Sequence, residues 1–257
     1  MSVAARTPTF SIIIEWENVR FIDLNRTREM LRVLRTELKT IQPPLRPPEV
    51  LFLYTVQNVP EALVRQVLAD DFKPEDVPAI TRVIPTDNLR YYEQKNFGAA
   101  HSSGEIKILL DSDVLPEAGW LSAMLKSFED PRVHVVAGQT YMAYDSFYTR
   151  AFALFWCWPL RDTTPGLTPS KIFHANNVAY RSEIYDAYPF PNLHGPIRQI
   201  YNAFGAQRMI WGSDITRLTS TYAENLRLFT EAIDFFSRED LEWIMGRTLA
   251  TRCNWPA

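Results

Sequence analysis

Two aspartates follow an apolar run near the middle of the chain. Residues 106–110 (IKILL) have the character of a buried strand, and Asp111-Ser112-Asp113 comes directly after them. Carboxylates two residues apart at a strand end can approach one hard divalent cation together, and such a cation can also bind a diphosphate. The same residues would also suit a solvated turn whose aspartates cap the next helix. The pattern therefore predicts a Mg²⁺ or Mn²⁺ site, with the turn as its alternative.

A second acidic strand end lies near the N-terminus. The apolar run at residues 10–14 (FSIII) is followed by Glu15 and Glu17. If this strand and the one before Asp111 are both central and parallel, their acidic ends lie at one edge of the sheet. Ligands of open α/β sheets bind beyond that edge, near a point where the strand order reverses.

Strand-like and helix-like patterns alternate along most of the chain. The runs of β-branched and other apolar residues lie at 10–14, 50–56, 80–84, 106–110 and 133–137. Between them, three- and four-residue spacing of apolar positions predicts helices at about 30–41, 60–68, 91–103 (closed by Gly104) and 117–128. Alternation of this kind predicts an α/β fold with a largely parallel sheet flanked by helices.

Further residues surround the two aspartates in a fixed order. Lys95-Asn96 and Gly98-Ala99 precede the strand, and Pro116 and Trp120-Leu121 follow it, with His174-Ala175-Asn176-Asn177-Val178-Ala179-Tyr180-Arg181 further on. This ordered set resembles the core of the family 2 glycosyltransferases over about residues 9–191. The resemblance implies a GT-A (Rossmann-like) fold that binds a nucleotide-sugar donor and a divalent metal, Mn²⁺ or Mg²⁺.

The resemblance also implies roles for individual residues on the donor side. Glu15 would lie near the base and ribose, and Lys95 and Asn96 would approach the nucleotide. Asp111 would contact the ribose or the metal, and Asp113 would be the principal metal ligand. The implied reaction is transfer of a sugar from a nucleoside diphosphate, expected to be UDP, to a hydroxyl acceptor that the sequence does not identify.

On the acceptor side, the resemblance places Asn176 and Asn177, and here the sequence departs from the family. Members carry an acidic catalytic base after this segment, whereas Glu183 and Asp186 stand here in another context. The second strand also lacks the acidic pair that members place near uracil. We therefore name no catalytic base, and a non-catalytic nucleotide-sugar-binding or interaction module is the alternative to an enzyme.

The pattern changes from about residue 195 onward. Residues 205–214 (GAQRMIWGSD) predict a turn, a short strand and a strand-end aspartate, and helical patterns follow them. This segment resembles the end of amidohydrolase 2 type metal-dependent hydrolases, in which Asp214 would be a metal ligand or base. No H-x-H pair is present in the sequence, so a structural carboxylate is the favoured interpretation and a hydrolase is the least favoured function.

We therefore expect a composite chain, with a glycosyltransferase-like domain at 1–193 and a mostly helical, amidohydrolase-like fragment at 194–257. The net charge of -3 and the mixing of acids with bases predict no nucleic-acid partner. The most apolar stretch, 151–160, is too short for a membrane span, which needs about 20 residues. Two distant cysteines and the absence of a signal-like N-terminus lead us to expect a cytoplasmic protein.

Overall fold

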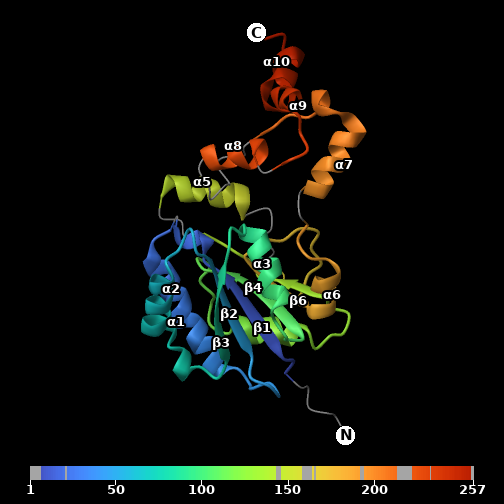
Figure 1. Cartoon of the computed structure of the whole chain (residues 1–257). Helices are drawn as coiled ribbons and strands as arrows, with labels where there is room; N and C mark the ends of the chain where they lie inside the picture. The colour runs from blue at the N-terminus through green and yellow to red at the C-terminus, as the bar shows by residue number, and fades with distance from the viewer. Residues whose placement is uncertain are drawn as a thin grey trace. The chain divides into compact units, whose positions relative to one another are not determined.

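The chain folds into two compact units, Met1–Phe190 (unit 1) and Pro191–Ala257 (unit 2), which are described separately below. The computed structural model describes residues 7–20, 22–142, 146–157, 164, 166–191, 194–212, 222–231 and 233–255. Figure 1 shows the strands gathered in unit 1, in blue to yellow, and the orange and red helices of unit 2.

Unit 1 is built on a six-stranded mixed sheet of order β3-β2-β1-β4-β6-β5. The strands are β1 (Phe10–Glu15), β2 (Glu49–Thr55), β3 (Ile80–Thr86), β4 (Ile106–Asp111), β5 (Val135–Ala137) and β6 (Asn177–Arg181). The strands β3, β2, β1 and β4 run parallel to one another, and β6 runs antiparallel to both β4 and β5. The chain builds outward from β1 to β3 and then returns to place β4 on the other side of β1, so the strand order reverses between β1 and β4.

Helices cover both faces of this sheet (Figure 1). The α-helices described in unit 1 are α1 (Leu24–Thr40), α2 (Glu61–Val67), α3 (Tyr91–Ala100), α4 (Trp120–Ser127), α5 (Phe147–Trp156) and α6 (Ser182–Ala187). Short turns of helix add η1 (Glu17–Arg20), η2 (Leu68–Phe72) and η3 (Pro74–Asp76). Residues of α1, α2, η2 and α4 pack on one face, and residues of α3 and α6 pack on the other.

The alternation of side chains along each central strand explains the two layers. In β1, Ile12 and Ile14 enter the larger hydrophobic cluster, whereas Ile13 enters the smaller cluster on the opposite face. All three are fully buried, as expected for a strand covered by helices on both sides. The predicted fold class is confirmed for unit 1, which is a Rossmann-like α/β domain with a largely parallel sheet flanked by helices.

Two glycines set how closely the chain approaches β1. A Cβ on Gly98 would come within 2.6 Å of Ile13 and 2.8 Å of Leu53, so glycine lets α3 lie directly on β1 and β2. A Cβ on Gly104 would lie 2.4 Å from the carbonyl carbon of Phe10. The prediction that Gly104 closes the preceding helix is wrong: α3 ends at Ala100, and Gly104 instead permits a close backbone contact with β1.

The helix after the two aspartates is capped by a distant side chain. Glu37 of α1 is buried, and its two carboxylate oxygens accept from the backbone N–H groups of Gly119 (2.8 Å) and Leu121 (2.9 Å). A carboxylate at a helix N-terminus satisfies unpaired donors and interacts favourably with the helix dipole. This contact fixes the start of α4 and, with it, the end of the loop that follows β4.

Unit 2 is helical in the residues that the structure describes. It contains α7 (His194–Phe204), η5 (Ala206–Arg208), α8 (Tyr222–Thr230), α9 (Arg238–Glu242), η7 (Trp243–Arg247) and α10 (Thr248–Arg252). Ser237 caps α9 by accepting from the Asp240 N–H. The predicted helical appendage is therefore confirmed.

The short strand predicted within residues 205–214 is wrong for the part that is described. Gly205 has a φ of 73° and ends α7, the next three residues form a helical turn, and residues 209–212 have no regular structure. The Trp211 N–H donates to the carbonyl of Ile244, which lies in a helix, so no strand pairs with this segment there. Asp214 lies outside the described residues. Among the helices that are described, none is long and apolar enough to cross a membrane.

Candidate functional site

Glu15 and Asp111 lie side by side where the strand order reverses. They are the last residues of β1 and β4, and the parallel register pairs them directly. Both side chains are buried, Glu15 completely and Asp111 to within 5%. The expectation that the two acidic strand ends share one edge of the sheet is confirmed, and this edge has the position at which open α/β sheets bind ligands.

Asp111 is held by two residues of α3. The Tyr91 hydroxyl donates to both of its carboxylate oxygens, at 2.9 and 2.7 Å, and the Lys95 ammonium donates to Oδ1 at 2.5 Å. Lys95 is fully buried and its nitrogen lies 4.4 Å from the centre of the Tyr91 ring. Burial, followed by the Asp111 and Glu15 carboxylates, raises the pKa of Tyr91, so its hydroxyl remains a donor.

Two acidic side chains, Glu15 and Asp111, are buried at this strand edge beside one basic side chain, Lys95. Burial, followed by the nearby Asp111 charge, raises the pKa of Glu15 to about 8, although Lys95 and the Glu17 N–H act in the opposite direction. Its Oε2 accepts from the Glu17 N–H at 2.8 Å, and Oε1 has no hydrogen-bond partner among the described residues. Glu15 therefore keeps its proton to higher pH than an ordinary glutamate does, and it lies beside an ion pair of Lys95 and Asp111.

Asp113 stands two residues further along, on the loop between β4 and α4. Its backbone carbonyl accepts from Nε of Arg26 at 2.6 Å, which ties the loop to the start of α1. The residue is half-buried, unlike the almost fully buried Asp111. The strand end thus carries one carboxylate engaged by Tyr91 and Lys95 and a second that is more accessible.

This donor set fits a metal that is shared with a diphosphate. Mg²⁺ is usually bound through one or two carboxylates, with phosphate oxygens and water completing its ligands. Among the described residues, no three His, Cys, Asp or Glu side chains are grouped so that they could hold a metal. Asp113 is the more accessible of the two strand-end carboxylates and therefore fits a solvated cation better than Asp111.

Asn176 and Asn177 meet the same edge from the other side of β4. Asn177 is the first residue of β6 and pairs with Leu110, and the Asn176 carbonyl accepts from the Asp111 N–H at 3.0 Å. The Asn177 side chain accepts from the Trp120 indole at 2.8 Å, and Asn176 accepts from the Thr140 hydroxyl at 3.4 Å. The predicted acceptor-side asparagines are thus brought next to Asp111.

Asn96 has a different setting from the other predicted residues. Its amide nitrogen donates to the Phe190 carbonyl at 2.8 Å, and its amide oxygen accepts from the Tyr185 hydroxyl and the Phe190 N–H. These contacts anchor α6 and the segment after it against α3. A direct role for Asn96 at the nucleotide stays a prediction, because its observed partners belong to the protein.

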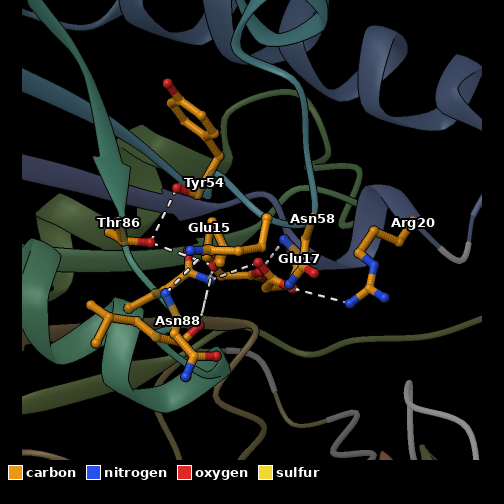
Figure 2. Close-up of polar contacts among 11 residues, drawn as sticks. Glu15, Glu17, Arg20, Tyr54, Asn58, Thr86 and Asn88 are labelled. Atoms are coloured by element: carbon orange, nitrogen blue, oxygen red, sulfur yellow. Dashed lines mark hydrogen bonds and ion pairs between the residues drawn. The ribbon is translucent and has the colours of Figure 1, made fainter.

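A polar network, which we call the Glu17 network, connects the ends of β1 and β2 with α3 (Figure 2). The two Glu17 carboxylate oxygens accept from the side-chain amides of Gln94 and Asn58, both at 2.9 Å. Gln94 is fully buried and also donates to the Thr55 hydroxyl at 2.9 Å. Figure 2 shows Glu17 joined by a dashed line to Arg20, whose guanidinium lies 3.6 Å from Oε2.

Sequence reasoning missed Tyr91 and Gln94 as site residues. Both lie on α3 beside Lys95, with Tyr91 one helical turn before it, so they share the side that faces the strand ends. That spacing is visible in the sequence, but a tyrosine and a glutamine carry no chemical signal comparable to paired aspartates. Only the packing of α3 on the sheet shows that their polar atoms reach Asp111 and Glu17.

The site residues of the central strand and helix lie inside a recognised family region. Residues 64–188 match the model of Glycosyl transferase family 2. This stretch includes Tyr91, Lys95, Asp111 and Asp113, and it ends shortly after β6. The resemblance inferred from the ordered motifs is supported over this region. No protein with a curated description matches the chain.

Several solved structures are similar to this chain. The mannosyltransferase PcManGT from Pyrobaculum calidifontis, in complex with GDP-Man and Mn²⁺, is 19% identical with a TM-score of 0.48, over 74% of this chain and 50% of that one. Glucosyl-3-phosphoglycerate synthase from Mycobacterium tuberculosis, in complex with UDP, is 13% identical with a TM-score of 0.44, over 97% and 82%. TarS from S. aureus, in complex with UDP, is 14% identical with a TM-score of 0.47, over 71% and 50%. The chain spans half the length of the first of these structures.

Proposed function

We propose that this chain is a glycosyltransferase that takes a sugar from a nucleoside diphosphate donor, UDP-linked, and delivers it to a hydroxyl acceptor. The observation that carries the proposal is the position of Asp111 and Asp113. They end the strand next to the reversal of strand order, inside the stretch that matches the Glycosyl transferase family 2 model.

In this proposal each strand-end residue contacts a different part of the donor. Asp113 would hold the divalent metal, Mn²⁺ or Mg²⁺, and a bound metal would neutralise charge on the departing diphosphate. Asp111, fixed by Tyr91 and Lys95, would accept hydrogen bonds from the ribose. Glu15, whose carboxyl has a pKa raised by burial, would line the nucleoside side.

The acceptor would lie on the other side of β4. Asn176 and Asn177 stand there, next to Asp111, and their amides can both donate and accept hydrogen bonds to sugar hydroxyls. Asn96 would not contact the acceptor but would hold the segment around Phe190 against α3. Amidohydrolase chemistry in unit 2 stays a prediction that rests on the sequence resemblance alone.

The carboxylates after β6 favour a second candidate, a module that binds the nucleotide sugar without turnover. Asp186 pairs with Lys107, near the amino end of β4, and the Ser182 N–H that opens α6 donates to the Glu105 carbonyl. Four residues of strand separate Lys107 from Asp111, about 13 Å at 3.3 Å per residue. Asp186 is therefore poorly placed to take a proton from an acceptor at the carboxyl end, where a general base would have to lie.

Turnover distinguishes the two candidates. The chain would be incubated with Mn²⁺ and UDP-linked sugars, and release of UDP would be followed with and without simple sugar acceptors. Release that disappears in Asp113→Ala supports the enzyme. Binding of UDP with Mn²⁺ but no release with any donor supports the module, and absence of both contradicts the proposed function.

A further inference from the structure

The Glu17 carboxylate is held in position by side chains from two other segments of the chain. It comes from the loop after β1, yet its oxygens are held by Asn58, from the turn after β2, and by Gln94, from α3. Its side chain is 13% exposed, so it is mostly buried but still accessible. Three separate segments of the chain therefore converge on one accessible acid.

Holding Glu17 in this way has an energetic cost. The Gln94 side-chain nitrogen serves three acceptors, namely Glu17, the Thr55 hydroxyl and the Leu89 carbonyl, whereas its oxygen has no partner among the described residues. A buried acceptor without a partner destabilises the folded state.

The charge on Glu17 is only partly compensated. Its two close donors are neutral amides, and the Arg20 guanidinium lies 3.6 Å away with 32% of its side chain exposed. Each carboxylate oxygen can accept two hydrogen bonds. The group can therefore accept further hydrogen bonds from a ligand at this edge of the sheet.

The position of Glu17 indicates which part of a donor it would meet. In the strand order, β6 and the acceptor-side asparagines lie on one side of β4, and β1 and β2 lie on the other. With the diphosphate at Asp113, as in the proposed function, a nucleoside that avoids the acceptor side extends toward β1 and β2. The Glu17 network lies at that end, where the side chains hydrogen-bonded within it are the uncharged Thr55, Asn58 and Gln94, and the Arg20 guanidinium lies 3.6 Å from Glu17.

We propose that Glu17 reads the nucleobase of the donor by accepting a ring N–H, and that it thereby selects uracil or guanine over cytosine and adenine. Uracil and guanine present a ring N–H at the pairing edge, which a carboxylate accepts. Cytosine and adenine present a ring nitrogen lone pair at the same place, and a carboxylate repels it. A site built around one hydrogen bond rejects ligands that lack the matching group, because its buried polar atoms then stay unpaired.

The inference rests on the proposed function and is tested separately from it. UDP, GDP, CDP and ADP would each be titrated with Mn²⁺ into the full chain and into Glu17→Gln. We expect the unmodified chain to bind UDP or GDP at least about tenfold more tightly than CDP and ADP. In Glu17→Gln, whose amide offers both a donor and an acceptor, we expect that preference to fall to within a few-fold, with CDP gaining most.

Two further variants keep the test interpretable. Glu61→Gln removes an equal charge from α2, where Glu61 accepts from Tyr54 and pairs with Arg65, and it should leave all four affinities unchanged. Glu17→Asp keeps the charge but shortens the side chain, so it should weaken UDP or GDP without improving CDP. Thermal melting would establish that each variant is folded.

The outcomes distinguish failure of the Glu17 inference from failure of the proposed function. If the unmodified chain binds all four nucleotides alike, or if Glu17→Gln keeps the full preference, Glu17 does not read the base, while the proposed function stands. If no nucleotide binds with Mn²⁺, the proposed function fails and this inference fails with it. Uracil and guanine are distinguished by which of UDP and GDP binds the unmodified chain more tightly.

Discussion

At the scale of single residues, Asp111 depends on its neighbours in α3. A buried carboxylate is tolerated only when it is paired and hydrogen-bonded, and here Lys95 supplies the charge while Tyr91 supplies a hydrogen bond to both oxygens. These contacts leave Asp113 as the more accessible of the two strand-end acids. The division of roles between the two aspartates thus follows from what surrounds each of them.

Replacing the Tyr91 hydroxyl should weaken this arrangement without removing the charge pair. Hydrogen bonds to charged groups contribute about 1.5–3 kcal/mol, so we expect Tyr91→Phe to lower the free energy of unfolding by about that amount in urea denaturation. Tyr92→Phe is the matched control, because Tyr92 is 48% exposed, and it should change stability by less than about 0.5 kcal/mol. Equal effects of the two variants would contradict the role given to Tyr91.

Glu15 should make stability depend on pH. Its pKa of about 8 in the folded chain lies above the ordinary value of 4.5. Below the ordinary value the carboxyl is protonated in both states, and its contribution is fully present. As pH rises toward 8, the unfolded chain loses the proton first, so stability falls by at most about 1.4 kcal/mol per pH unit.

Glu15→Gln removes this titration, and we therefore expect it to flatten the decline. Urea denaturation at about pH 5 and about pH 8 would measure the difference. The unmodified chain should lose more stability between the two conditions than the variant. Identical losses would show that Glu15 is ionised in the folded chain.

At the scale of elements, the sequence predicts the strands better than the contacts between them. The first five strands are apolar runs, and each lies where it was expected. β6 was described only as a motif, because Asn177–Arg181 mixes polar and apolar residues and forms a strand through pairing with β4 and β5. The strand predicted near residue 210 is wrong since its neighbours in unit 2 are helices, which offer it no ladder of hydrogen bonds.

The candidate site was predictable to the same extent. Glu15, Asp111 and Asp113 follow apolar strands, so their shared edge follows from the alternation of strands and helices. The hydrogen-bond partners that α3 and the turn after β2 supply to Asp111 and Glu17 depend on tertiary packing, which a local sequence pattern does not predict. Glu17 was noticed as an acid beside Glu15, but its contacts with Asn58 and Gln94 were not foreseeable.

The close packing of α3 on the sheet can be tested at Gly98. A methyl group there would come within 2.6 Å of Ile13 and 2.8 Å of Leu53, and overpacking of this kind costs about 1–3 kcal/mol. We expect Gly98→Ala to lower the melting temperature and to weaken UDP binding, because α3 carries Tyr91, Gln94 and Lys95. Gly195→Ala in α7, where a methyl group meets nothing within 4 Å, is the control and should be neutral.

At the scale of the whole molecule, the two units differ in how much apolar surface they bury. The sheet of unit 1 has fully buried side chains on both faces. In the described part of unit 2, the buried apolar residues are Ala206, Ile233 and Ile244. A region with few buried apolar contacts opens more readily than a packed sheet.

Hydrogen exchange should therefore separate the two units. We expect backbone amides of β1, β2 and β4 to exchange slowest, and amides of α7 to α10 to exchange much faster under the same conditions. Addition of UDP with Mn²⁺ should slow exchange at the carboxyl ends of β1 and β4, since a ligand that binds the folded state stabilises it. Protection of unit 2 equal to that of the sheet would contradict this difference in stability.

The measurement that tests the central claim most directly is calorimetric titration of UDP in the presence of Mn²⁺. The account predicts binding by the unmodified chain that requires the metal and is lost in Asp113→Ala. Asp76→Ala, which removes an exposed carboxylate in η3, should bind as the unmodified chain does. Binding that persists in Asp113→Ala would contradict the metal site, and no binding by the unmodified chain would contradict the nucleotide site itself.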